Sequence, residues 1–121
     1  MNMKKYLFFA LLLIGSTSYA DCKTSNVYTD IECYEKQLKL DKSNLNKIYG
    51  NLFSKLDDEG KIALEASQKA WLNYREKECN GLMGYFGSQS LGAGSHLITL
   101  SCVAEKTKDR IKELKIGRAH V

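Results

Sequence analysis

The sequence contains no proline, two histidines and one tryptophan. Without proline, the chain lacks the residue that most strongly interrupts helices. Neither a His-Glu-x-x-His nor a Gly-x-Ser-x-Gly pattern is present, and His96 has no nucleophile beside it in sequence. A paired-carboxylate glycosidase needs two carboxylates about 5 to 9.5 Å apart across a cleft, for which a domain this small has little room. We therefore expect no catalytic residues, no bound metal and no cofactor.

An excess of charge of one sign is also absent. Lys4 and Lys5 belong to the first 20 residues, and without them 16 basic residues face 14 acidic residues, which lowers the net charge from +4 to +2. Such a balance gives no indication of a nucleic acid or an anionic membrane as a partner.

The first 20 residues have the three parts of a cleavable secretory signal peptide. Lys4 and Lys5 give a positive start, residues 6–14 form an apolar run, and Ser18 and Ala20 put small residues where signal peptidase reads. The apolar run is shorter than the roughly 20 residues that span a bilayer, so we expect no stable membrane anchor. Residues 1–20 are predicted to be removed on export, which leaves one domain, residues 21–115.

The last residues form a segment of a different kind. Residues 116–121 are the translation of a nucleotide sequence that resembles a common sequencing-library adapter. We expect this segment to be a non-native tail, so Arg118 and His120 carry no functional argument.

Four cysteines lie in the mature part, at Cys22, Cys33, Cys79 and Cys102. An even number in an exported domain of this size indicates two disulfides. Three pairings are possible, and the residues alone do not choose between them. Pairing the first two cysteines and the last two cysteines closes two compact loops, and each disulfide would stabilise the fold by roughly 3 kcal/mol. No two cysteines stand two to four residues apart, so a zinc site is not indicated.

Apolar residues at spacings of three and four predict an all-α fold, a small bundle of three to four helices stapled by two disulfides. A capping box from Thr29 to Glu32 predicts the start of the first helix. Its apolar stripe is interrupted only by Asp41, which fits either one long helix or two helices with a break there. The stripe consists of Ile31, Tyr34, Leu38, Leu45, Ile48, Leu52 and Leu56.

Two further long helices are expected. The acidic residues and glycine of 57–60 suit a turn and the start of the second helix, which Gly81 is expected to end. Residues 81–95 contain five glycines and predict a loop. The last helix is expected from about His96 or Thr99 to Lys115. The buried side of the second helix is predicted at Leu64, Ser67, Trp71 and Tyr74, and that of the last helix at Leu100, Val103, Thr107, Ile111 and Leu114.

A set of spaced residues gives the chain a family likeness. The most specific block is Gln68-x-Ala70-Trp71-x-x-Tyr74-Arg75-x-x-x-Cys79. The other elements are Cys22 and Cys33, Leu40-Asp41, Leu45-Asn46 with Tyr49, Cys102, Thr107, Arg110 and Leu114. With these residues the chain, from Cys22 to Leu114, resembles the lysozyme-inhibitor LprI-like family of small secreted bacterial proteins.

This resemblance implies a compact helical domain in the bacterial periplasm or at the cell surface, and it supports the two local disulfides. It also implies a peptidoglycan-degrading enzyme as partner, since inhibition of lysozyme is associated with the family's name. The family tends to have proline in the loop before its last cysteine, and this chain has none. The resemblance therefore does not determine the conformation of that loop or the partner that the loop would bind.

One helical face carries several motif residues, and we interpret it as structural. Gln68, Trp71, Arg75 and Cys79 follow one another at spacings of three, four and four and point at the same neighbour. Trp71 is expected to anchor the core, and Arg75 to form an ion pair with Glu32 or Asp41. The remaining structural residues, Tyr74, Thr107 and Arg110, are expected to tie the helices together.

The predicted loop of residues 81–95 is the candidate partner-binding site. It exposes Tyr85 and Phe86 among small residues, as binding loops do. A disulfide between Cys79 and Cys102 would pin its base and lower the ordering cost on binding. The alternative is a connector whose aromatic side chains fold back onto the core. The candidate residues are Met83, Tyr85, Phe86, Ser88 and His96.

Two functions are therefore carried forward. The first is a periplasmic proteinaceous inhibitor or immunity-type protein that blocks a peptidoglycan hydrolase, lysozyme-like or an amidase, by inserting the loop into its cleft. The second is a non-catalytic envelope module that binds a small ligand, a cell-wall component or another periplasmic protein. The oligomeric state stays open at this point.

Overall fold

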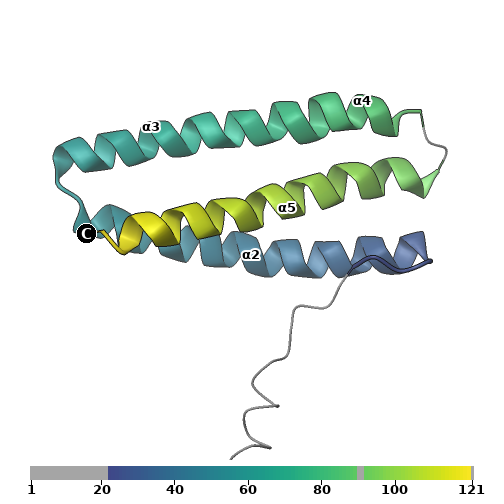
Figure 1. Ribbon diagram of the computed structural model, residues 1–121, viewed down its shortest axis with the longest axis horizontal. Coiled ribbons are helices and arrows are strands. Elements are labelled where there is room, and N and C mark those ends of the chain that lie inside the picture. The colour runs from purple at the N-terminus through teal and green to yellow at the C-terminus, as the bar shows by residue number, and fades with distance from the viewer. Residues whose placement is uncertain (1–21, 90–91, 121) are drawn as a thin grey trace, which may run out of the picture.

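The computed structural model describes residues 22–89 and 92–120, which form a bundle of three long helical segments (Figure 1). The first segment is α2 (Val27–Lys55); the second consists of α3 (Asp58–Arg75), the π-helical η1 (Glu76–Leu82) and α4 (Met83–Gly87); the third is α5 (Ala93–Arg118). α2 and α5 run in the same direction, and the middle segment returns antiparallel to them. The predicted all-α fold with two disulfides is confirmed. The predicted signal peptide lies outside the described residues.

The start of α2 differs from the predicted capping box. Asn26 is the N-cap, and its side-chain oxygen accepts hydrogen bonds from the backbone N–H groups of Tyr28 and Thr29, at 3.0 and 3.2 Å. Glu32 forms an exposed ion pair with Lys36 at 3.3 Å instead of closing a capping box. The predicted cap at Thr29 is wrong because an asparagine three residues earlier already satisfies free N–H groups of the first turn.

α2 is a single helix, so the unbroken one of the two predicted arrangements is present. Its buried side chains follow the predicted stripe, and Asp41 is buried among them with 8% of its surface exposed. The buried residues of α2 are Asp30, Tyr34, Leu38, Asp41, Leu45, Ile48 and Leu52. A carboxylate thus occupies a core position midway along the helix.

The turn into α3 follows the sequence prediction. Asp57 is the N-cap, and its carboxylate accepts a hydrogen bond from the Gly60 N–H at 2.8 Å. Asp58 and Glu59 occupy the first turn, where carboxylates stabilise the positive end of the helix dipole.

The apolar core lies mainly between α2 and α5. One cluster contains Leu45, Ile48, Leu52, Leu64, Ile111 and Leu114, and the other contains Cys22, Tyr34, Leu38, Leu100 and Ala104. Leu64 is the single buried residue of α3, whereas Ser67 and Tyr74, predicted on its buried side, are exposed. The packing prediction for α3 is therefore wrong in part, and this helix is attached to the bundle by other means.

The middle segment does not end at Gly81. The helix continues through η1 and α4 to Gly87, so the loop predicted for residues 81–95 is wrong over its first half. In the π-helical stretch the backbone N–H of Met83 bonds to the carbonyl of Glu78, five residues earlier. The glycines of this stretch are therefore part of a helix and do not form a loop.

The π turn explains how α4 faces α5. In a regular α-helix, Phe86 would return to the face of Cys79, seven residues earlier. A π turn takes up an additional residue, and Gly87 reaches α5 instead; Gly87 is buried and Phe86 is exposed. A Cβ at Gly87 would lie 3.2 Å from the carbonyl oxygen of Ser95. Glycine here permits a close approach of α4 to α5.

The chain enters α5 after Gly92, whose φ of +69° is the one positive φ among the described residues. This left-handed region favours glycine because it has no Cβ. α5 begins at Ala93, before the predicted start, and ends at Arg118, inside the predicted tail. Val103, predicted on the buried side, is half-buried. Neither α5 nor any other helix in the described ranges is long and apolar enough to cross a membrane.

Candidate functional site

Polar side chains join α3 to α5. The guanidinium of Arg110 donates to the Gln68 side-chain oxygen at 3.0 Å and to the Ser67 hydroxyl at 2.9 Å. Further along, Arg75 Nη1 donates to the Thr107 hydroxyl at 3.0 Å. The structure thus places the motif residues between two helices, where they hold α3 against α5.

Trp71 lies between the two arginines of this interface. Its ring is 4.8 Å from the Arg75 guanidinium carbon and 5.8 Å from that of Arg110. Trp71 is half-buried and packs against the cluster that contains Leu64. Stacking of a guanidinium on an indole face is attractive, so the tryptophan links the polar layer to the apolar core.

Arg75 does not form the predicted ion pair. Neither Glu32 nor Asp41 lies within ion-pair distance of it among the described residues, and its hydrogen-bond partner is the fully buried Thr107. Burial lowers the pKa of the Arg75 guanidinium from its usual value, and the nearby Glu76 opposes this shift. The expectation of a carboxylate partner is wrong because a neutral hydroxyl and an aromatic face together accommodate the cation.

Tyr74 lies at the edge of the same interface. Its ring is half-exposed and lies 5.3 Å from the Lys106 ammonium of α5. The pKa of Lys106 is raised, first by its hydrogen bond to the Tyr74 side chain. Tyr74 therefore contributes a polar contact to α5 in place of the apolar burial predicted for it.

The aromatic side chains of α4 are exposed at one end of the bundle. Tyr85 is 64% exposed and Phe86 is 52% exposed, and their rings meet edge to face with centroids 5.7 Å apart. Leu82 of η1 is also exposed. The base of this segment is cross-linked, since Cys79 is bonded to Cys102 of α5. We call Leu82, Tyr85 and Phe86 the α4 tip.

The other residues of the predicted binding loop lie in three different settings. Met83 is half-buried and lines a cavity of about 310 Å³ beside α5. Ser88 is the C-cap of α4, and its hydroxyl donates to the Tyr85 carbonyl oxygen at 2.6 Å. His96 Nε2 lies 3.7 Å from the Glu35 carboxylate of α2. The structure places Met83, Tyr85, Phe86 and Ser88 on one short segment, whereas the ring of His96 faces α2.

Metal ligands do not gather in this part of the chain. No group of three or more His, Cys, Asp or Glu side chains in the described ranges is placed to hold a metal ion.

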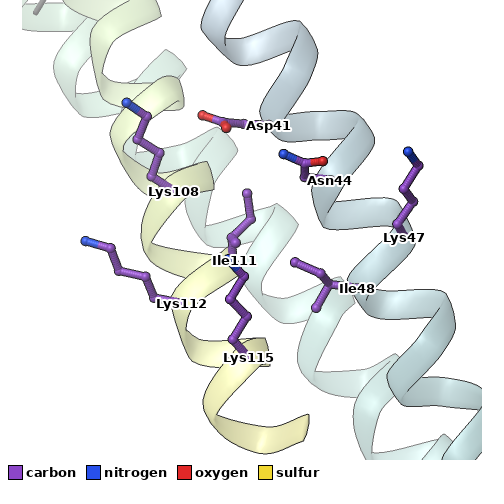
Figure 2. Close-up of a pocket in the computed structure, with 8 residues that line it drawn as sticks. All are labelled: Asp41, Asn44, Lys47, Ile48, Lys108, Ile111, Lys112 and Lys115. Atoms are coloured by element: carbon purple, nitrogen blue, oxygen red, sulfur yellow. The ribbon is translucent and has the colours of Figure 1, made fainter. Parts of the chain in front are cut away.

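A second surface feature is a groove between α2 and α5, which encloses a cavity of about 600 Å³ (Figure 2). Asp41 and Ile48 project into it from α2, toward α5. Three lysines of α5 lie along the opposite wall. The lining residues of this α2–α5 groove are Asp41, Asn44, Lys47 and Ile48 of α2 and Lys108, Ile111, Lys112 and Lys115 of α5.

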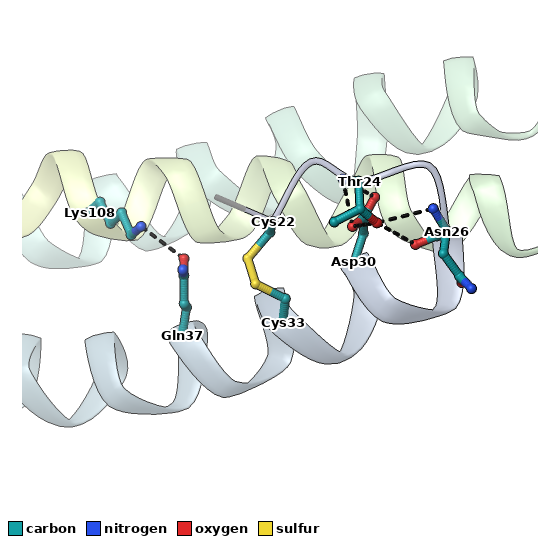
Figure 3. Close-up of a disulfide and its surroundings, with 7 residues drawn as sticks. All are labelled: Cys22, Thr24, Asn26, Asp30, Cys33, Gln37 and Lys108. Carbon is teal, nitrogen blue, oxygen red and sulfur yellow. Dashed lines mark hydrogen bonds between the residues drawn. A yellow bond between two sulfur atoms is a disulfide. The ribbon is translucent and has the colours of Figure 1, made fainter. Parts of the chain in front are cut away.

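The N-terminal disulfide fastens the segment before α2 onto that helix (Figure 3). Cys22 is bonded to Cys33 with their Cα atoms 5.5 Å apart, which confirms the local pairing. The buried Asp30 carboxylate accepts hydrogen bonds from the backbone N–H and the hydroxyl of Thr24, at 2.9 and 2.6 Å. The disulfide and these hydrogen bonds hold the same few residues against the helix.

Sequence reasoning missed the α2–α5 groove. From the sequence, Asp41 interrupts the apolar stripe, belongs to the Leu40-Asp41 element of the family resemblance and is a predicted partner of Arg75. The available signal was weak: lysines recur on α5 at 108, 112 and 115, around the apolar Ile111. The groove is formed by two segments that lie 60 or more residues apart in the sequence, so only the fold brings this carboxylate and the α5 lysines together.

Comparison with known proteins identifies a matching family and a similar bacterial protein. The sequence profile of the family described as "Lysozyme inhibitor LprI" matches residues 20–114. The chain is also similar to the "Uncharacterized protein YecT" of Escherichia coli (strain K12), with 29% identity over 149 residues, covering 96% of this chain and 92% of that protein. No solved structure matches the chain significantly. The family match includes all four cysteines and the block from Gln68 to Cys79.

Proposed function

We propose that this chain, which belongs to the lysozyme inhibitor LprI family, is an exported inhibitor of a peptidoglycan-degrading hydrolase. The target is a lysozyme-like glycosidase or an amidase, and the α4 tip binds it. An immunity role, in which the protein protects a cell wall from such an enzyme, is part of the same proposal. The two disulfides support export, because disulfides persist in oxidising compartments outside the cytosol.

The observation that carries this proposal is the exposure of Tyr85 and Phe86 on a helix whose base is cross-linked. Aromatic residues supply much of the binding energy in protein interfaces because they bury large areas with few rotatable bonds. α4 is helical, and Cys79 ties it to Cys102, so the tip loses little conformational freedom on binding.

The position of the tip suits entry into a cleft. α4 lies at one end of an elongated bundle, so the tip can approach a recessed surface before the long sides of the bundle meet the enzyme (Figure 1). Inhibition is then steric: two aromatic side chains occupy space that the substrate needs. This differs from the flexible loop expected from the sequence, since the inserted element is a helix with a fixed shape.

The test measures binding and protection together. The oxidised protein, purified from the periplasm, is mixed with a panel of lysozymes and amidases, and complex formation and lysis of cell walls are followed. We expect one enzyme class to bind and to lose lytic activity in proportion to the complex formed. Absence of both effects across the panel would contradict the proposal for the enzymes included.

Substitution locates the inhibitory surface. Replacing both Tyr85 and Phe86 by alanine should weaken binding by at least about 1 kcal/mol, the loss that marks an interface residue as important in alanine scans. The control is Ile62→Ala, because Ile62 is 69% exposed and lies near the start of α3, at the opposite end of the bundle. Equal potency of the double variant and the control would place the inhibitory surface elsewhere.

A further inference from the structure

The α2–α5 groove has the size and the lining of a small-ligand site. Its cavity of about 600 Å³ falls within the range of known ligand pockets, roughly 300 to 1,000 Å³. Ile48 and Ile111 supply apolar surface inside it, and four lysines, at positions 47, 108, 112 and 115, supply positive charge. The groove lies on a different part of the bundle from the α4 tip.

Asp41 is the unusual member of the lining. Its side chain is more than nine-tenths buried, and Oδ2 has no hydrogen-bond partner among the described residues. A buried polar atom that lacks a partner destabilises a fold, and a carboxylate oxygen does so more than a neutral group. An aliphatic residue would suit this core position of α2 better, so the carboxylate has no evident structural purpose there.

The lysines do not supply the missing hydrogen bond. The Lys108 ammonium donates to the Gln37 side-chain oxygen at 2.9 Å, and no lysine is within hydrogen-bond distance of the buried oxygen of Asp41. Figure 2 shows the Asp41 carboxylate pointing from α2 into the space between the two helices. The groove therefore offers one acceptor in its interior and several cations around it.

This arrangement selects a ligand that carries both kinds of charge. A pure polyanion would satisfy the lysines but would be repelled by Asp41 and would leave its oxygen without a donor. A simple cation could approach Asp41 but would be repelled by the four lysines of the groove. A molecule with an ammonium group and several carboxylates satisfies both, since the ammonium donates to Asp41 and the carboxylates bind lysines.

We propose that the α2–α5 groove binds a short acidic peptide with a free amino terminus. The ammonium group of the peptide donates to Asp41, its carboxylates lie against Lys108 and Lys112, and a small aliphatic side chain packs on Ile48 and Ile111. This binding does not depend on the inhibitory function of the α4 tip, and the two sites are tested with different variants.

The probe is the tripeptide alanyl-glutamyl-glutamate, which has one ammonium group and three carboxylates. Its binding to the oxidised full chain is measured by calorimetry and by shifts of backbone amide signals in nuclear magnetic resonance spectra. We expect the shifts to concentrate on residues 41–48 and 108–115. Shifts confined to other residues, or no binding at millimolar concentration, would overturn the proposal.

Two companion probes separate the contacts. The N-acetylated tripeptide lacks the ammonium group, and tricarballylate has three carboxylates without any amino group. Both should bind at least about tenfold more weakly than the free tripeptide, because neither provides a charged donor to Asp41. Equal affinity of all three probes would show a groove that attracts only anions and would overturn the role of Asp41.

Matched variants test the residues. Asp41→Asn should lower the affinity for the free tripeptide at least about tenfold, and Lys112→Gln should lower it and reduce its dependence on salt. Lys69→Gln, on α3, removes the same charge outside the groove and should leave the affinity unchanged. If the Lys69 variant loses as much affinity as the Lys112 variant, the loss comes from the change in net charge and not from the groove, and the proposal is overturned.

Stability gives a readout that a purely structural Asp41 would not produce. If the carboxylate is kept for a ligand, Asp41→Leu should raise the melting temperature of the free protein by about 4 °C or more while binding is lost. A lower melting temperature in both Asp41→Leu and Asp41→Asn would show that the carboxylate stabilises the fold, and would overturn the assignment.

Discussion

Helix α5 contacts α2 mainly through apolar side chains, whereas it contacts α3 through arginines, a tryptophan and hydroxyl groups. On the α2 side, Leu100, Ile111 and Leu114 are buried in two apolar clusters. On the α3 side, Arg110 bonds to Gln68 and Ser67, and the Cys79–Cys102 disulfide closes the end of the interface. Apolar contacts stabilise a fold without requiring a particular orientation of the two helices, whereas hydrogen bonds and a disulfide require specific geometry. The α2–α5 pair therefore supplies stability, and the α3 side fixes how the α4 tip is presented.

The largest expected effect lies on the apolar side. Ile111→Ala should destabilise the protein by about 2 to 5 kcal/mol, because it removes buried methyl and methylene groups and leaves a cavity between α2 and α5. Denaturant unfolding of the oxidised protein measures this loss. Ile62→Ala, at an exposed position, should change stability by less than about 0.5 kcal/mol. Similar losses in the two variants would contradict the assignment of the core to the α2–α5 pair.

A smaller and more local effect is expected on the polar side. Thr107→Val keeps the size of a fully buried side chain but removes the oxygen that accepts the Arg75 hydrogen bond. The loss should be about 1 to 3 kcal/mol. Hydrogen exchange should increase mainly in α3 and η1, while α2 keeps its protection. Thr29→Val, at an exposed position of α2, serves as the control. A uniform increase across all helices would show that the two interfaces are not separable.

The smallest effect concerns Lys106 and depends on pH. Its pKa is raised above the ordinary 10.5, first by the hydrogen bond to Tyr74, so the folded state favours the ammonium form. The stabilisation is fully present below the ordinary pKa and is lost as the pH rises through the folded value. Because Lys106 is still partly exposed to solvent, which screens the interaction, this stabilisation amounts to only a few tenths of a kcal/mol. Tyr74→Phe should return the Lys106 pKa toward 10.5, which nuclear magnetic resonance can measure. An unchanged pKa would contradict the hydrogen bond between Lys106 and Tyr74.

Local sequence signals predicted most of the helical structure, and the local cysteine pairing that the family resemblance supported is present. The stripe from Tyr34 to Leu52 and the turn at Asp57 depend on residues close in sequence, and both appear in the structure. The predicted start of α2 is wrong because two capping signals lie three residues apart, and Asn26, the earlier one, accepts the hydrogen bonds of the first turn.

Features that depend on packing between distant segments could not be predicted. Gly81 has the usual properties of a helix end, but in the structure the helix continues to Gly87, where α4 closely approaches Ser95 of α5. The partner of Arg75 proved to be Thr107, 32 residues away, and no local pattern distinguishes that hydroxyl from a carboxylate partner. The α2–α5 groove is of the same kind, since Asp41 lies on α2 and three of the lysines lie on α5, more than 60 residues later.

The Cys79–Cys102 disulfide spans the connection between α4 and α5. A protease that cuts this connection once would produce two polypeptides, but the bond would still join the helix that carries Tyr85 and Phe86 to α5. A single cut in this connection would therefore leave the α4 tip attached to α5. The cut form would separate into two fragments only after reduction.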